Sequence, residues 1–276
     1  MFSSLVGKLE EEVVDNVIQP IVHSTVSQKV VELRGWGFKE LPSTIKGCIN
    51  DTAAGPKEVE IGGKKHTISA VTHHFLQKHF VESPKAQEKL DRFSNKFTTE
   101  LEPVILDVTK NSDNDITDYT VLQLKVELGL AKAPPTTETK SNDWPPIPAL
   151  PEQPTTIDTV AHKVRTTVRD ANTRILPDIV KVIPPTLESV ITKFINQEIQ
   201  EGFEELKHGW KLLDGFVDWA ERGLEHAQKT ICEEIFNIVW GGMEPKITLD
   251  LKAKLVELEQ SVADSVRASM KKIPGF

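Results

Sequence analysis

Four histidines lie close together in the sequence and are the first candidates for metal chemistry. They are His66, His73, His74 and His79. Two metal ligands on one helix must be three or four residues apart, so that both imidazoles lie on the same face. His74 and His79 are five apart, and His73 and His79 are six apart. Since only Glu82 adds a carboxylate nearby, the spacing favours surface or boundary histidines over a metal site.

Two further segments resemble parts of metal sites, but each lacks something that the chemistry requires. Glu205 and His208 form the Glu-x-x-His unit of di-iron helix bundles, yet such a site needs this unit twice. The nearest counterpart, Asp158 with His162, has a spacing of four, which favours ordinary surface pairs. Residues 113–115 begin like a calcium loop that has neither the turn glycine nor the closing glutamate. We interpret them as a helix-capping turn.

Motifs for nucleotide or nucleophilic chemistry are missing. The sequence has no phosphate-binding loop, dinucleotide glycine pattern or nucleophile elbow. Cys48 and Cys232 have no zinc-site companions, so we expect reduced residues of an intracellular protein, with Cys232 in a helix core. Neither Cys48 nor Ser189 has a context that marks a nucleophile. We therefore expect no metal and no cofactor, and a non-enzymatic protein is favoured over an enzyme.

The charge balance is mildly acidic, with 33 basic and 41 acidic residues. No strongly basic face emerges to follow a phosphate backbone, which argues against nucleic acid as a partner. No run approaches the ~20 apolar residues of a membrane span. The apolar N-terminal run meets Glu10, Glu11 and Glu12 almost at once, so no secretory signal is expected. The expected location is cytoplasmic.

The stretch from Thr186 to Trp240 organises the predicted helices. It contains no proline, and its apolar residues recur three and four apart, on one stripe of an α-helix. The first stripe consists of Leu187, Val190, Ile191, Phe194, Ile195, Ile199, Phe203, Leu206, Trp210 and Leu213. As one rod, these fifty-five residues would extend roughly 80 Å at ~1.5 Å each. We expect a fold-back at Asp214-Gly215, because glycine ends helices and aspartate caps them.

Five tryptophans against one tyrosine is an unusual usage. Trp210, Trp219 and Trp240 lie in the organising stretch, where a bulky core is the ordinary interpretation. The alternative is contact with a partner subunit or a lipid headgroup boundary, because both favour large amphipathic rings. Together with Phe203, these three are the candidate interaction residues.

The N-terminal part is predicted to be helical with one small hairpin. A first helix should end or kink at Pro20, and a second should stop at Gly35-Trp36-Gly37. Near 57–69 the apolar period changes to two around a Gly-Gly pair, which favours a tight β-hairpin. Residues 121–128 fit both a strand and a helix that stops at Gly129, and we favour the helix.

Residues 132–156 change character because of their prolines, which exclude a helix or a central strand. An extended linker is the expected structure. Trp144 within it could dock on a domain. The segment is interpreted as a spacer, and the alternative is a proline-rich ligand for an aromatic groove of another protein.

Prolines and glycines also mark expected breaks in the C-terminal part. Thr155 or Thr156 should cap its first helix, and Thr248 should cap its last. Between them, the sequence predicts a kink at Pro177, a turn at Pro184-Pro185, and the end of the organising stretch at Gly241-Gly242 and Pro245.

A fold-back at Pro184-Pro185 would pair two helical segments antiparallel and place basic residues of one opposite acidic residues of the other. The two sets are Lys163, Arg165 and Arg169 before it, and Glu198, Glu201 and Glu204 after it. Each exposed pair would contribute only ~0–1 kcal/mol, so the pairs would set register more than stability. Solvated charges on two independent faces fit the pattern equally well.

The predicted fold is mainly α. We expect a helical domain with a hairpin (1–131), a proline-rich linker (132–156) and a C-terminal bundle or extended hairpin of long amphipathic helices (157–276). The expected function is that of a non-enzymatic assembly protein, a homo-oligomer or a subunit of a larger complex. The alternatives are a peripheral lipid- or membrane-surface-binding protein and an enzyme with a site between the two domains.

Overall fold

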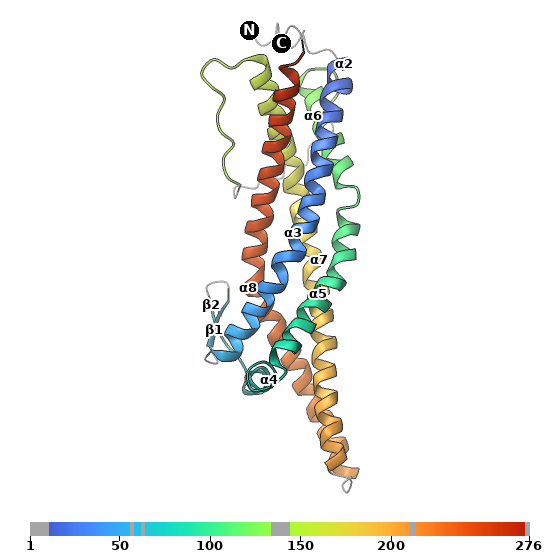
Figure 1. Ribbon diagram of the computed structural model, residues 1–276, viewed down its shortest axis with the longest axis vertical. Coiled ribbons are helices and arrows are strands. Elements are labelled where there is room, and N and C mark those ends of the chain that lie inside the picture. The colour runs from blue at the N-terminus through green and yellow to red at the C-terminus, as the bar shows by residue number, and fades with distance from the viewer. Residues whose placement is uncertain (1–10, 56–57, 62–63, 134–143, 210–213, 274–276) are drawn as a thin grey trace. The chain divides into compact units, whose positions relative to one another are not determined.

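The computed structural model describes residues 11–55, 58–61, 64–133, 144–209 and 214–273 (Figure 1). Within these ranges, only the backbone is described at 36–40, 59–61, 64, 66, 202–209 and 214–224. The chain is mainly α-helical, which confirms the predicted class. Over the part that the structure describes, no helix is long and apolar enough to cross a bilayer.

Three helical elements follow one another without a break at the start of the described chain. They are α2 (Glu11–Val13), the π-helical turn η1 (Val14–Ile18) and α3 (Gln19–Ala54). The helix does not end at Pro20. The wide π turn ends at Ile18, two residues before this proline, which has no N–H for a regular helical hydrogen bond and whose ring crowds the preceding turn.

The stop predicted at Gly35-Trp36-Gly37 is also wrong, because α3 continues through it. Apolar side chains are buried at helical spacing on both sides of the glycines, with Val30 and Leu33 before them and Leu41 and Ile45 after them. Each helical glycine costs about 1 kcal/mol, whereas burying an aliphatic side chain gains about 1.5–3 kcal/mol. Burial therefore decides the conformation.

Two short strands follow α3 in the segment where a hairpin is predicted. β1 (Glu58–Ile61) and β2 (Lys64–Thr67) pair antiparallel, with Glu58 opposite Thr67. α4 (Ala70–Phe80) then begins after Ser69, whose hydroxyl accepts a hydrogen bond from the backbone N–H of Thr72. This is an ordinary N-cap.

α5 (Ala86–Val108) and α6 (Ser112–Glu127) run up to the proline-rich segment. The chain leaves α6 at Gly129, which has a φ of 75°. This left-handed conformation costs glycine little, and it lets Leu130 N–H bond back to Lys125 C=O at 2.8 Å. The helical interpretation of residues 121–128 is confirmed.

α7 (Thr156–Gly209) and α8 (Asp214–Met270) are the longest helices. Thr155 caps α7 as predicted, because its hydroxyl accepts a hydrogen bond from the N–H of Asp158 at 3.1 Å. The Asp158 carboxylate accepts in return from the N–H and O–H of Thr155. The predicted reversal near Asp214 agrees with a helix that ends at Gly209 and another that begins at Asp214. Residues 210–213, between these two helices, lie outside the described residues.

The turn predicted at Pro184-Pro185 and the helix ends predicted near Gly241-Gly242, Pro245 and Thr248 are wrong, because α7 and α8 continue through these positions. α7 also continues through Pro177, where a kink stays a prediction. Buried apolar residues continue at helical spacing across each place. They are Leu176, Ile179, Ile183, Leu187 and Val190 in α7 and Val239, Met243, Ile247, Leu251 and Leu255 in α8.

By its internal contacts the chain divides into two compact units. Unit 1 contains residues 1–36, 105–179 and 248–276, and unit 2 contains residues 37–104 and 180–247. The predicted boundaries at 131 and 157 do not coincide with this division, because both units draw on residues from both sides of the proline-rich segment. Independent folding of 1–131 and 157–276 stays a prediction.

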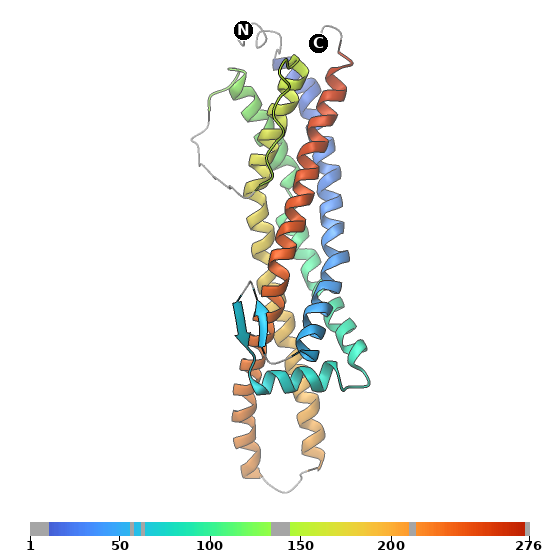
Figure 2. The ribbon, with the colours of Figure 1, turned by 90° about the vertical axis from the view of Figure 1, so that its left-hand side faces the viewer.

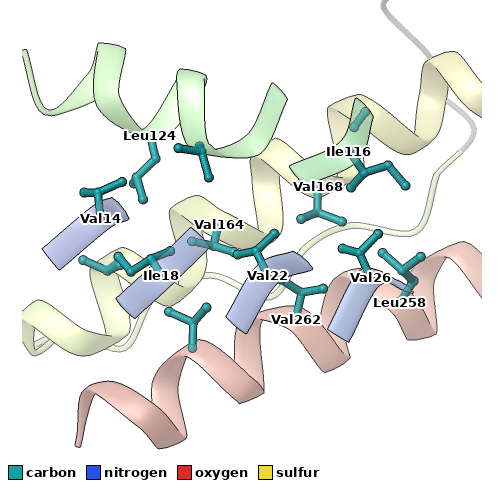
Figure 3. Close-up of a cluster of buried hydrophobic side chains, with 14 of the residues drawn as sticks. Val14, Ile18, Val22, Val26, Ile116, Leu124, Val164, Val168, Leu258 and Val262 are labelled. Carbon is teal, nitrogen blue, oxygen red and sulfur yellow. The ribbon is translucent and has the colours of Figure 1, made fainter. Parts of the chain in front are cut away.

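Unit 1 is a bundle of four helical segments, from α2–α3, α6, α7 and α8, which lie side by side in Figures 1 and 2. Its core is rich in valine, which packs between the helices as Figure 3 shows. The buried valines are Val14, Val22, Val26, Val30, Val121, Val160, Val164, Val168, Val262 and Val266.

The core of unit 2 contains more aromatic side chains. Phe194 of α7 stacks on Phe80 with ring centroids 5.8 Å apart and meets Phe93 edge-on at 5.3 Å. Within this unit the last part of α7 and the first part of α8 run side by side in both views (Figures 1 and 2). A hydrogen bond from the amide of Gln228 to that of Asn196 joins them.

Candidate functional site

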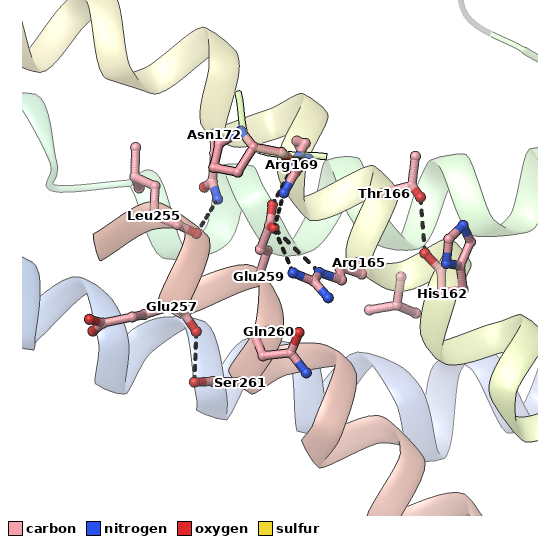
Figure 4. A network of polar contacts seen from close by, with 12 residues as sticks. His162, Arg165, Thr166, Arg169, Asn172, Leu255, Glu257, Glu259, Gln260 and Ser261 are labelled. Carbon is pink, nitrogen blue, oxygen red and sulfur yellow. Dashed lines mark hydrogen bonds and ion pairs between the residues drawn. The ribbon is translucent and has the colours of Figure 1, made fainter. Parts of the chain in front are cut away.

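A buried glutamate in unit 1, Glu259 of α8, binds two arginines of α7 (Figure 4). Its side chain has no solvent exposure. Arg169 donates from Nε to Oε2 at 2.8 Å and from Nη2 to Oε1, and Arg165 donates from Nε and Nη2 to Oε1 at 3.3 Å each. The Arg169 contact is bidentate, the geometry that gives the strongest charge-assisted hydrogen bonds.

Asn172, one turn after Arg169, extends this cluster. Its amide nitrogen donates to the backbone carbonyl of Leu255 at 3.0 Å, so α7 also holds α8 through the main chain (Figure 4). Arg169 has a further partner, because its Nη1 donates to the carbonyl oxygen of Pro145. Its guanidinium carbon lies 5.9 Å from the centre of the Trp144 ring, within range of a cation–π interaction. One guanidinium thus joins the buried carboxylate to the proline-rich segment.

Unit 2 contains a second buried glutamate, Glu198 of α7, whose side chain is 1% exposed. His79 of α4 and Lys89 of α5 contact its Oε2, and Arg92 of α5 contacts its Oε1. Arg92 also lies over the ring of Phe194, with 5.6 Å between guanidinium carbon and centroid. Three helices therefore meet at one carboxylate.

The Nδ1 atom of His79 lies between Glu198 and Lys89, and each of these partners requires a different protonation state of that nitrogen. Its Nδ1 is 3.0 Å from Glu198 Oε2 and 3.0 Å from Lys89 Nζ. The ammonium of Lys89 can only donate, so it bonds to Nδ1 when that nitrogen is unprotonated. When Nδ1 carries a proton, it donates to Glu198 instead.

The electrostatics of the Glu198 cluster favour the ionised carboxylate. Burial alone raises the pKa of Glu198, but the hydrogen bonds from His79 and Lys89 outweigh burial and hold the pKa at about 2, against an ordinary 4.5. The carboxylate therefore stays charged at neutral pH, as a buried anion with positive partners does.

The ion pairs in these two clusters differ from those predicted from the sequence. The prediction pairs Arg165 and Arg169 with Glu198 across a fold-back at Pro184-Pro185, and it is wrong because α7 does not fold back there. Arg165 and Arg169 are four residues apart, an unfavourable like-charge spacing on a helix unless a carboxylate lies nearby. This spacing was the available sequence signal for a buried partner, although it does not identify Glu259.

A small cavity lies between α7 and α8 in unit 2. Its volume is about 170 Å³ and its lining consists of Glu188, Thr192, Cys232, Glu233, Phe236 and Asn237. Cys232, predicted to be core, is only half-buried. Burial raises the pKa of the Cys232 thiol, which leaves little of the nucleophilic thiolate at neutral pH. Ligand pockets usually measure about 300–1,000 Å³, so this cavity is small for one.

The histidines of the predicted cluster have separate environments. His73 Nε2 contacts the carbonyl oxygen of Gly55 at 3.2 Å, His74 is exposed, and His79 belongs to the Glu198 cluster. The side chain of His66 lies outside the described residues. Where side chains are described, no three His, Cys, Asp or Glu residues gather as a metal site would require.

The other sequence candidates are distributed as follows. Asp113 does not cap α6, which has no side-chain cap bond at Asn111, but lies in its first turn and accepts from the Ser27 hydroxyl. Trp240 of α8 is half-buried. The side chains of Phe203, Trp210, Trp219, Glu205 and His208 lie outside the described residues.

Comparisons of the chain with protein-family models, with curated proteins and with solved structures gave no match.

Proposed function

We propose that the protein is a non-enzymatic assembly protein whose long helices associate with copies of the same chain or with other subunits. The observation that carries the proposal is how the buried ionisable groups are used. Glu198 and Glu259 are each bonded to cations from neighbouring helices, so they stabilise helix packing rather than point into a cavity. Buried charges of this kind also favour one helix register over others.

The cavity at Cys232 supports the same proposal. An active site needs converging polar groups around a space that holds a substrate. Here the space is small, and burial disfavours the reactive form of the thiol. The candidate contact residues remain Phe203, Trp210, Trp219 and Trp240.

The test compares alanine variants of these residues in the full chain. If they contact a partner subunit, Phe203→Ala, Trp219→Ala and Trp240→Ala will lower the solution mass measured by light scattering and leave the subunit's melting temperature unchanged. If they belong to the subunit's own core, each replacement will cost about 3–5 kcal/mol and lower the melting temperature without changing the mass. Leu249→Ala is the control, since Leu249 is an exposed apolar residue of α8 outside the organising stretch and should change neither the mass nor the melting temperature. Liposome flotation of the same samples separates association from binding to a lipid surface.

A further inference from the structure

The proline-rich segment before α7 has a burial pattern with a period of three. Trp144, Ile147 and Leu150 are half-buried, and every residue between them is exposed. A β-strand would bury every second residue. A polyproline II helix has three residues per turn, so it presents every third residue on the same face. A polyproline II conformation over residues 144–151, with one face packed on the protein, accounts for this pattern.

The next face of the same segment carries prolines at the same period. Pro145, Pro148 and Pro151 are exposed and follow each half-buried residue by one position. We call these three residues the proline ridge. Described residues 144–155 form no helix or strand, so this backbone does not pair in a sheet.

The segment is fixed rather than a free spacer. Arg169 donates to the carbonyl oxygen of Pro145 and lies over the ring of Trp144. Its guanidinium is itself held by the buried carboxylate of Glu259. All these residues belong to unit 1, so the predicted role as a spacer between two domains is wrong for residues 144–155. A partner that binds the ridge would not have to order the chain first, which lowers the entropic cost of binding.

We infer that the proline ridge is a docking site for a protein domain with an aromatic-lined groove. Such grooves accept prolines three residues apart in a polyproline II helix. The charge of the segment indicates which charge the rim of the partner's groove should carry. Between residues 144 and 155 the one ionisable side chain is Glu152, and it is exposed. An acidic groove rim, which needs an arginine or lysine in its ligand, is therefore disfavoured, and a neutral or basic rim fits. This inference does not rest on the proposed self-association.

The test titrates the full-length protein into two sets of purified probe domains. The first set consists of WW domains with a neutral or basic groove rim, and the second of SH3 domains with an acidic rim. Saturable binding to a member of the first set is expected, with weaker or no binding to the second. The Pro148→Ala/Pro151→Ala variant should bind about tenfold more weakly, because it removes two ridge rings. Both residues are exposed, so the fold should be retained, which circular dichroism will check.

Pro146→Ala is the matched control, because Pro146 is an exposed proline of the same segment that lies off the ridge. It should bind like the unaltered protein. The inference is overturned if no domain of the first set binds, or if the double variant binds as tightly as the Pro146→Ala control. This test measures binding of a probe domain, whereas the proposed self-association is tested by the solution mass. A negative result here would therefore not contradict the proposed self-association.

Discussion

The pKa of Glu198 links one residue to the acid stability of unit 2. Its folded pKa is about 2, below the ordinary 4.5. A lowered carboxyl pKa stabilises the fold fully above about pH 5, and this contribution is lost as the pH falls toward 2. The difference corresponds to about 3 kcal/mol for a side chain that is 1% exposed. We expect the gap in unfolding free energy between the unaltered protein and Glu198→Gln to shrink by about this amount between pH 5 and pH 2.

Urea unfolding at several pH values measures that gap. Glu201→Gln is the control, because Glu201 is an exposed glutamate on the same helix. Its gap should stay small and nearly constant. A gap for Glu198→Gln that is the same at pH 5 and pH 2 would contradict the assignment.

Glu259 should be costly to neutralise. Its removal leaves Arg165 and Arg169, which are 14% and 12% exposed, without their carboxylate. Breaking a buried pair from one side costs about 3–5 kcal/mol, so Glu259→Gln should lower the unfolding free energy by this order. Glu257→Gln, at an exposed glutamate two residues away that pairs with Lys254, should cost at most about 1 kcal/mol. Equal losses in the two variants, measured by urea unfolding, would show that the Glu259 cluster contributes little.

At the scale of single residues, the sequence suggested pairing Lys163, Arg165 and Arg169 with Glu198, Glu201 and Glu204, with separate solvated charges as an equal alternative. Arg165, Arg169 and Glu198 instead bind other partners. Their partners depend on where the chain reverses, and that depends on burial along the whole helix. Glu259 and Lys89 had no local pattern that marked them, because their partners lie many residues away in the sequence.

The glycines within helices provide a test at the scale of elements. An added Cβ at Gly35 or Gly47 of α3 would meet no atom within 4 Å. Because alanine forms helices better than glycine, each substitution should raise stability by about 0.5–1 kcal/mol. At Gly242 of α8 the added Cβ would lie 2.9 Å from Cys48 Sγ. Gly242→Ala should therefore not raise stability, because the contact with Cys48 offsets the gain in helix propensity.

A Cys48→Ala background serves as the control for that loss, since it removes the crowding sulfur. There, Gly242→Ala should stabilise the protein like the two α3 substitutions. The comparison uses thermal or urea unfolding of the single and double variants. A gain from Gly242→Ala in the unaltered background would show that the Cys48 side chain moves aside at no cost.

Helix-breaking residues predicted the ends of the helices less well than any other sequence feature. Pro20, Pro177, Pro184-Pro185 and Pro245 all lie inside helices. A proline in a helix interior costs about 3 kcal/mol, which several buried aliphatic side chains offset. The apolar spacing across each proline was visible in the sequence and predicted the structure better. Where the apolar spacing and a capping or helix-ending residue agreed, as at Thr155 and Gly129, the predicted helix ends were confirmed.

At the scale of the whole molecule, the two compact units could not be predicted from a division along the sequence. α3, α5, α7 and α8 each contribute residues to both units. Composition locates a proline-rich segment, but it does not tell whether that segment separates domains or packs on one. The period of three in Trp144, Ile147 and Leu150 was readable in the sequence and was the signal for packing.

The measurement that tests the proposed assembly function most directly is the solution mass of the full-length protein across a wide concentration range. The chain has a mass of 30.8 kDa. We expect light scattering to give a mass above this value, either rising with concentration or fixed at a whole multiple of it. A mass of 30.8 kDa at every concentration, together with no co-purifying subunit from cell extract, would contradict it.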